Sequence, residues 1–456
     1  MEDAGDTILD PIMMGNGTTG VSVNQMNRKF IGIEVVQYVF FVILIAINFN
    51  NGVGAKIDTD QKTSNSKWWK GNLHTHSFWS DGDDFAEMIV SWYVENGYNF
   101  LALSDHNILQ EGDKWIFPAA GGEAVEKTYL NYLAKFGKEW VETEEDPELG
   151  LTVRLKPLNE FRSLFETPGQ FLLIQGEEIT ARFINKPVHL NASNLATLIT
   201  PKSGRSVREV IQNNVNAVME QRRQIGRPIL VHVNHPNFGW ALTAEDIAEV
   251  ENEKFFEVYN GHPSVRNYGD AAHISTEEMW DQILIKRLTN GSGEIIYGIA
   301  TDDAHNYHQY QSNRSNPGRG WIMVKAAFLT PGLIIRAMEK GDFYSSTGVI
   351  IKSFEKNWQS FKIEIEPEDG ITYITQFIGK MKSNTVDSES MDSQRRNSKE
   401  GVNGLILAEE SGFKVQYDFK GDEIYVRAKV ISSKEKENPY HEGEFESAWL
   451  QPTVEF

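Results

Sequence analysis

Two histidines one residue apart, His74 and His76, open a polar motif, NLHTHSFWSDG, at residues 72–82. On a β-strand, residues i and i+2 point to the same side, so the two imidazoles would project together. Asp81 follows five residues later beside a glycine, where a loop could fold its carboxylate back over them. Two imidazoles and a carboxylate are suitable ligands for a divalent transition metal.

More residues of this kind follow other hydrophobic segments, each where a predicted strand ends. They are Asp105 and His106 in LALSDHN, Glu177 and Glu178 in LIQGEEIT, His189 in VHLNA, His235 in VNHPN, and Asp302, Asp303 and His305 in ATDDAH. In barrels of alternating strands and helices, the carboxyl ends of the strands meet at one mouth, where the chemistry takes place. A single histidine at a strand end is usually structural, but so many in this position predict a metal cluster.

The segments that would position these residues alternate between strand and helix patterns. The predicted strands are 71–76, 100–104, 171–175, 187–190, 229–233, 255–259, 295–299 and 321–324, and the predicted helices are 85–95, 207–223, 243–252, 277–288 and 331–340. This alternation predicts parallel strands, and so many of them within about 280 residues predict an α/β barrel rather than an open sheet. The charged segment 109–166 is an insertion to which we assign no function.

The helical patterns stop after residue 348. Short alternating segments predict strands at 361–365, 414–419, 424–431 and 447–452, and the Ser-, Asn- and charge-rich residues 380–399 predict an exposed loop. We therefore expect three parts: an N-terminal extension at 1–55, a barrel at 56–348 and a small all-β domain at 349–456.

Composition limits the classes of partner. The chain of 456 residues has 64 acidic against 44 basic residues, and its formal net charge is −20. Such a surface repels polyphosphate, so we expect a small-molecule substrate and no nucleic-acid partner. Cysteine is absent, so any metal must be held by His, Asp and Glu. The oligomeric state does not follow from the sequence.

The first 55 residues predict an export signal. The apolar run YVFFVILIAI at 38–47 is too short to span a bilayer, which takes about 20 apolar residues, but it has the length of a signal-peptide core. A basic pair at 28–29 precedes it, and the small residues 53–55 follow it as a cleavage site. The acidic, Gly-rich start does not fit a signal peptide, so we expect translation from Met26 and cleavage near Ala55. An uncleaved membrane anchor is the alternative, and either way we expect a periplasmic or extracellular protein.

Five of these motifs resemble, in order, those of the PHP (polymerase and histidinol phosphatase) superfamily: NLHTHSFWSDG, LALSDHN, GEEIT, VNHPN and TDDAH. The resemblance covers about residues 71–348. Within it, KGNLHTHSFWSDG, EVYNGHP, NPGRGW, FYSSTG and the C-terminal β-segment are similar to the exported carbaryl-hydrolase-like metallohydrolases. The resemblance implies a distorted seven-stranded barrel of strands and helices that holds two or three divalent metal ions, zinc, manganese or iron.

The superfamily's metal ligands then fall on nine residues: His74, His76, Asp81, His106, Glu178, His189, His235, Asp303 and His305. Glu178 matches the usual spacing from Gly176, and its carboxylate would bridge two metals. The resemblance implies one metal at His74, His76 and Asp303, a second at Asp81 and His106, and a third at His189, His235 and His305. Asp81 stands where many members have histidine, and this harder ligand favours manganese or iron as well as zinc.

Four neighbours are secondary candidates. Asp105 could orient His106, because histidines that bind metal usually donate the proton of their other ring nitrogen to a carboxylate or carbonyl. Alternatively, Asp105 could pack at the strand end. His232 is expected behind the ligands or in the core. His262, in EVYNGHP, could face the mouth and bind substrate or transfer a proton. Arg319, in PGRGW, could hold an anionic substrate, although an exposed loop arginine is the simpler interpretation.

These residues predict a hydrolase in which a metal-bound hydroxide attacks phosphorus or a carbonyl carbon. There is no cysteine nucleophile and no GxSxG serine motif. We expect Glu178, Asp303 and His262 to be catalytic. Phosphoester hydrolysis fits the superfamily, carbamate or carboxyl-ester hydrolysis fits the narrower resemblance, and a secreted binding protein with a metal-stabilised barrel is a third interpretation. A polymerase-associated role is opposed by the export signal and the charge.

Overall fold

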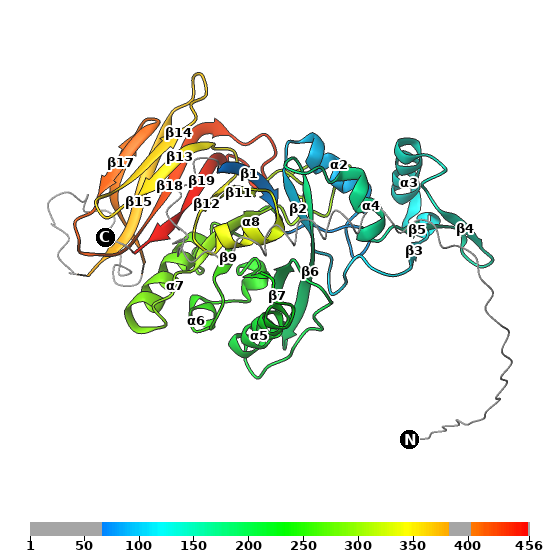
Figure 1. Cartoon of the computed structure of the whole chain (residues 1–456), viewed down its shortest axis with the longest axis horizontal. Helices are drawn as coiled ribbons and strands as arrows, with labels where there is room; N and C mark the ends of the chain where they lie inside the picture. The colour runs from blue at the N-terminus through cyan, green and yellow to red at the C-terminus, as the bar shows by residue number, and fades with distance from the viewer. Residues whose placement is uncertain (1–65, 383–402, 455–456) are drawn as a thin grey trace, which may run out of the picture. The chain divides into compact units, whose positions relative to one another are not determined.

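One mixed sheet of 13 strands joins the predicted barrel strands to the C-terminal strands (Figure 1). In this computed structural model the described residues are 66–382 and 403–454, all within one compact unit. Along the sheet the strands are β10 (Tyr297–Thr301), β9 (Phe255–Asn260), β8 (Leu230–Val233), β7 (Lys186–Ser193), β6 (Leu172–Phe183), β2 (Phe100–Leu103), β1 (Lys67–Asn72), β11 (Trp321–Ala326), β12 (Phe343–Ser346), β19 (Phe445–Thr453), β18 (Glu423–Glu435), β15 (Tyr373–Met381) and β16 (Leu405–Ser411).

The strand directions are mixed. Strand β2 is parallel to β1 and β6, and β9 is parallel to β8 and β10, as expected. The prediction of parallel strands is wrong for β7, which is antiparallel to β6 and β8, and for β11, which is antiparallel to β1. Strand β6 ends at Phe183 and β7 begins at Lys186. The chain turns between them at Ile184, whose φ is +56°. Strands joined by so short a turn can pair only antiparallel.

The end of β1 also meets the segment that follows β10. The backbone N–H of His76 donates to the carbonyl of Ala304 (3.0 Å), and the N–H of Asp303 donates to the carbonyl of His74 (3.1 Å). Seven strands, β1, β2 and β6 to β10, thus follow one another with contact between the first and the last. This contact brings ligand candidates from the two ends of the series together.

Helices form close to the predicted ranges: α2 (Ala86–Glu95), α5 (Val207–Ile225), α6 (Ala244–Ala248), α7 (Thr276–Asn290) and α8 (Pro331–Met338). The starts of the last four are fixed by side-chain caps, which satisfy N–H groups that a first helical turn leaves unpaired, whereas α2 has no such cap. Ser206 caps α5, Thr243 and Ser275 form capping boxes, and Thr330 precedes the proline that begins α8. The apolar face of α5 packs in one core with residues of β7 and β8.

The insertion has its own small sheet. It contains β3 (Lys114–Ile116), η2 (Pro118–Gly121), α3 (Gly122–Phe136), β4 (Thr143–Asp146), β5 (Gly150–Leu155) and α4 (Leu158–Phe165), and its strands lie in the order β3-β5-β4. Tyr132 and Trp140 donate hydrogen bonds to the buried carboxylate of Glu87 on α2 (2.6 and 3.0 Å). The insertion is therefore anchored to the helix that follows the first histidine motif.

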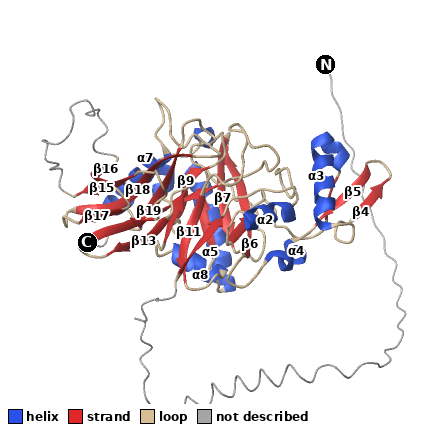
Figure 2. Ribbon diagram, turned by 90° about the horizontal axis from the view of Figure 1, so that it is seen from above, coloured by secondary structure: helices blue, strands red, loops and turns tan. Residues whose placement is uncertain are grey.

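After residue 348 the described residues form strands only. A second sheet has the order β13 (Ile351–Lys356), β14 (Ser360–Ile365), β17 (Lys414–Asp418), whereas β15, β16, β18 and β19 extend the large sheet (Figure 2). Because β19 pairs with β12, the C-terminal strands continue the sheet of the preceding region. A separate C-terminal domain therefore stays a prediction. In the described part of the chain, no helix has the length and apolarity needed to cross a membrane.

Candidate metal centre

Glu178, on β6, lies among five histidines. Its side chain is almost fully buried. The imidazoles within 3.4 Å of its oxygens are His189 (2.9 Å) and His235 (3.3 Å) at Oε1, and His106 (2.9 Å), His76 (3.3 Å) and His74 (3.4 Å) at Oε2. One carboxylate thus faces two sets of imidazoles through its two oxygens, as a ligand that bridges two metals must.

Asp303, after β10, is the second buried carboxylate of the cluster. Its Oδ1 lies 3.2 Å from Nε2 of His76, 3.3 Å from Nε2 of His74 and 3.6 Å from Nδ1 of His305. Because the first two atoms also face Glu178, the two histidines and the two carboxylates form one group of four donors.

Asp81 forms a second group on the open side of the cluster, where its side chain is 55% exposed. Its carboxylate lies 3.4 Å from Nε2 of His106 and 3.4 Å from Nε2 of His305. The expected grouping of His305 with His189 and His235 is wrong. His305 stacks on His76 at 4.0 Å between ring centroids, because the segment after β10 is hydrogen-bonded to the end of β1.

The third group consists of His189, on β7, and His235, after β8. Their rings are 5.1 Å apart, and both approach Oε1 of Glu178. Asn234 donates to the same oxygen at 2.9 Å and so fixes the carboxylate. The structure therefore brings all nine predicted ligands together, but sorts them differently from the expected partition.

Two of the nine have strained backbones. His235 has φ +20° and Asp303 has φ +49°, in the left-handed region that non-glycine residues seldom adopt. Such conformations persist only where the surrounding structure holds them, and they concentrate at functional sites. Here they turn ligand side chains toward the cluster immediately after a strand.

Several ligand atoms lack the partners that buried polar atoms normally have. They are Nε2 of His74 and His76, Nδ1 of His189 and Oε2 of Glu178, and none of these four atoms makes a hydrogen bond. Imidazole nitrogens and carboxylate oxygens that converge in this way match the ligand chemistry of zinc, manganese or iron. The residues present therefore fit a group of divalent metals.

The carboxylates and imidazoles of the cluster shift one another's pKa values. Burial alone would raise the pKa of Glu178 and of Asp303, but the surrounding histidines, His74 first, hold both pKa values well below the usual range. Burial and the neighbouring His305 lower the pKa of His76 to about 3. Although burial lowers them, the neighbouring carboxylates raise the pKa values of His74, His106, His235 and His305. Since metals bind ionised carboxylates and neutral imidazoles, a bound metal would displace protons from these histidines.

Glu177 points away from the cluster, as the alternation of a strand requires. Its carboxylate is buried and accepts the backbone N–H of Ile199 at 2.6 Å, and burial raises its pKa to about 8. Glu177 and Glu178 thus have opposite environments on one strand.

The secondary candidates have different positions. Asp105 does not orient His106: its carboxylate accepts hydrogen bonds from the backbone of Ser77 (2.8 Å) and from the side chains of Ser80 (2.7 Å) and Gln110 (2.8 Å), so it holds the loop after β1. His232 is buried behind the ligands, with Nε2 3.4 Å from Glu257.

His262 lies beside the cluster but belongs to none of the three groups. Its ring is 5.5 Å from that of His305 and 6.3 Å from that of Phe238, in the short helix η3 (Phe238–Trp240). The backbone N–H of Ser264 donates to its Nδ1 (3.1 Å), so the ring proton is on Nε2. Burial lowers the pKa of His262 to about 4, which keeps this imidazole neutral.

Arg319 requires a correction, because it is neither exposed nor available to an anion. The residue is fully buried, and its guanidinium donates to the carbonyls of Gly261 (2.9 Å), Gln311 (3.0 Å) and Asn438 (3.1 Å). It therefore ties together loops around the site and does not bind substrate. The sequence did not indicate this role, because Gly318 and Gly320 on either side predicted an exposed loop.

Sequence reasoning missed Glu257 as part of this region. It lies within β9 and its Oε1 is 2.7 Å from Nδ1 of His74. The available signal was a carboxylate inside FFEVYN, a segment otherwise typical of a buried strand.

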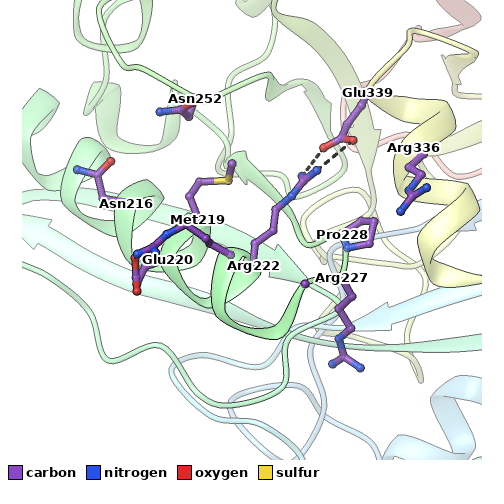
Figure 3. A pocket seen from close by; sticks show the side chains of 11 residues that line it. Asn216, Met219, Glu220, Arg222, Arg227, Pro228, Asn252, Arg336 and Glu339 are labelled. Atoms are coloured by element: carbon purple, nitrogen blue, oxygen red, sulfur yellow. Dashed lines mark hydrogen bonds and ion pairs between the residues drawn. The ribbon is translucent and has the colours of Figure 1, made fainter.

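A cavity of about 730 Å³ lies elsewhere, among residues of the end of α5, the segments before β8 and β9, and α8. Figure 3 shows Arg222 facing Glu339 across it, and the two form an ion pair. Its lining contains no histidine or aspartate, so the cavity has none of the cluster's chemistry.

Comparison with known proteins identifies no family model that matches the chain and no matching curated protein. A two-domain protein from Bacteroides vulgatus, named for a predicted PHP-like metal-dependent phosphoesterase, is 14% identical over 82% of this chain and 92% of its own, with a TM-score of 0.38. A protein from Bifidobacterium adolescentis, named as a candidate metal-dependent phosphoesterase, is 13% identical over 52% of this chain and 87% of its own, with a TM-score of 0.25. At these identities neither likeness by itself assigns an activity to this chain.

Proposed function

We propose that this protein is a metal-dependent hydrolase of the PHP type, acting as a phosphoesterase on a small molecule. The observation that carries the proposal is Glu178, a buried carboxylate whose two oxygens face five imidazoles within 3.4 Å. In this proposal the seven strands β1, β2 and β6 to β10 form the distorted barrel that the motifs imply, and the ligands lie at its mouth.

Glu178, His74, His76 and Asp303 would hold one metal, and Glu178, His189 and His235 a second. Asp81, His106 and His305 would hold a third. Bound divalent metals supply an activated water at neutral pH and a Lewis acid for the oxygen of the group attacked. The ionised Glu178 and Asp303 give the cluster the negative charge that retains such cations.

His262 is the residue best placed to act on the substrate. Its Nδ1 is occupied by the N–H of Ser264, so Nε2–H is the group that can donate a hydrogen bond. A neutral imidazole donor beside the metal ligands can stabilise charge that develops on a substrate oxygen. Phe238 offers an apolar surface next to it.

Ester or carbamate hydrolysis is the second candidate, and one observation favours it. The ion-pair partners of Asp81, Glu178 and Asp303 among the described residues are all histidines, with no lysine or arginine. Phosphate sites commonly add such cations to the metals. A neutral ester or carbamate would not require them.

Metal analysis followed by assays on both substrate classes tests the proposal. We expect the protein, purified without chelators, to contain two to three divalent ions per chain and to hydrolyse aryl phosphates, and a chelator should abolish the activity. Faster hydrolysis of aryl esters or carbamates would select the second candidate. Less than one metal per chain would refute both and leave a binding protein.

We propose further that the protein is exported and cleaved near Ala55, although residues 1–65 lie outside the described part of the chain. The support is the apolar run at 38–47 followed by small residues. Mass spectrometry of the mature protein from its own host tests this. A mature chain that retains the run would indicate an anchor, and an intact cytosolic chain would contradict export.

A further inference from the structure

Glu257, on β9, is a buried carboxylate whose two oxygens are contacted by four hydrogen-bond donors. It has no exposed surface. Its Oε1 lies 2.7 Å from Nδ1 of His74 and accepts the hydroxyl of Thr301 at 2.8 Å. Its Oε2 accepts the backbone N–H of His235 at 2.7 Å and Nδ2 of Asn260 at 2.8 Å. Both oxygens are therefore used as acceptors from two neighbours each.

The contact with His74 determines which ring nitrogen can bind metal. An imidazole that donates its Nδ1 proton to a carboxylate leaves Nε2 as the ligand atom and becomes a better donor to the metal. Nε2 of His74 is the atom that faces Glu178 (3.4 Å) and Asp303 (3.3 Å). The carboxylate on one side of the ring thus orients the opposite nitrogen toward the cluster.

The contact with His235 acts on the backbone instead. His235 has φ +20°, and its N–H would be left without a partner in the interior if Glu257 were absent. Asn260 extends the same network, since its Nδ2 also donates to Asp303 at 3.1 Å, and Asp303 is the other strained ligand. A strained backbone conformation persists only where surrounding contacts such as these hydrogen bonds hold it.

We propose that Glu257 is a positioning residue that fixes His74 and His235 together, one by its ring and one by its backbone. It thereby sets two of the three groups of ligands from a single carboxylate. This inference rests on the proposed function to the extent that these histidines bind metal.

Because four hydrogen-bond donors contact Glu257, Glu257→Gln is an informative substitution. The amide keeps the size but replaces one acceptor oxygen with an NH₂ group. If the NH₂ faces His74, that ring must accept at Nδ1 and carry its proton on Nε2, where it can no longer bind metal. If the NH₂ faces His235 instead, two N–H donors oppose each other at a strained backbone. Either orientation disturbs one ligand.

The matched control is Glu253→Gln. Glu253 is also fully buried and precedes the same strand, and its Oε1 accepts only a backbone N–H, that of Phe255 (2.8 Å). The amide oxygen of glutamine can keep that bond. No contact joins Glu253 to a predicted metal ligand among the described residues.

The experiment titrates the metal-free full chain with Zn²⁺ by calorimetry and records imidazole ¹⁵N spectra of the zinc-loaded, histidine-labelled protein. We expect Glu257→Gln to weaken at least one site by about 10- to 100-fold, and Glu253→Gln to bind as the wild type does. In the loaded wild type His74 should be bound through Nε2 and retain its proton on Nδ1. A residue with a merely structural role would change the unfolding temperature without changing either readout.

Equal affinities in Glu257→Gln and wild type would overturn the positioning role and leave the hydrolase proposal intact. Metal binding without hydrolysis would overturn the hydrolase proposal, and the affinities would still test Glu257. If Glu257→Gln does not fold, the wild-type spectrum decides, because His74 bound through Nδ1 would overturn the inference.

Discussion

His235 and His262 follow β8 and β9 and lie in or beside the cluster, whereas residues that precede the same two strands line the cavity of Figure 3. Two of the four arginines that line that cavity are paired with its two glutamates. Arg222 pairs with Glu339 and donates to the carbonyl of Ile229 (3.1 Å), and Arg223 pairs with Glu220 one turn earlier on α5. Each of these cations has a partner within the protein.

The cluster at the other end has the reverse character. Four of its ligand atoms are buried without hydrogen-bond partners, and two of its residues have strained backbones. A folded chain tolerates such features where a ligand compensates them. The difference teaches that unsatisfied donors and acceptors, rather than the volume of a cavity, distinguish the candidate metal centre of this molecule.

The strongest test of this difference compares Glu178→Gln with its control, Glu177→Gln. A neutral amide cannot bridge two cations, so we expect the first variant to lose at least one metal and more than about 100-fold in hydrolysis. Glu177 faces the other side of β6, and its hydrogen bond from Ile199 can survive as an amide contact. Equal losses in the two variants, measured by elemental analysis and turnover, would contradict the bridging role.

His262→Ala tests whether the residue beside the cluster acts on substrate. Loss of its Nε2–H should lower kcat by about 100-fold, a typical contribution for proton transfer or charge stabilisation, with metal content unchanged. His273→Ala is the control, because His273 is an exposed histidine that stacks on Trp240 at 4.0 Å. A parallel loss of metal in His262→Ala would instead make it a ligand.

Arg222→Gln tests the paired end. Removing a partly exposed ion pair should cost about 1 kcal/mol of unfolding free energy. Hydrolysis and metal content should stay at wild-type values, because the cavity is not part of the cluster. Chemical denaturation and turnover measure the two effects, and a large fall in turnover at full metal content would show that the two ends are coupled.

The smallest effect on the metal site is expected for Glu253→Gln, which should change only the pH dependence of stability. Burial raises the pKa of Glu253 to about 8. The folded chain then keeps a proton that the unfolded chain releases above its ordinary pKa of about 4.3, so this group reduces stability as pH rises toward 8. The variant lacks that dependence. Its unfolding temperature, relative to wild type, should therefore increase from pH 5 to pH 8, and a constant difference would contradict the raised pKa.

The ligand set could be predicted because most candidates lie at or just after the end of a predicted strand, and strand ends of this pattern converge. The grouping could not, since it depends on which ends touch. His305 lies beside Asp81 only because residues after β10 pair with the end of β1. Asp105 was ambiguous for the same reason, as its partners Ser77 and Gln110 come from two loops.

The directions of some strands and the roles of buried polar residues could not be predicted from the sequence either. The turn at Ile184 and Asn185 has none of the glycines that mark tight hairpins, so β6 and β7 were expected to be parallel. Glu257 sits inside a strand whose six residues are all buried, and only its partners reveal its role. The sequence prediction also missed the C-terminal strands β13, β15 and β16.

The contact between the first and last strands of the series also determines when the site can form. Tyr307 donates to the carbonyl of His76 at 3.0 Å across 231 positions of the chain. Contacts so distant in sequence form late and slow the folding rate. Synthesis at about 5–20 residues per second separates the two segments by about 10–45 s. A nascent chain shorter than 305 residues lacks His305, so the complete set of predicted ligands can assemble only after that residue has been made.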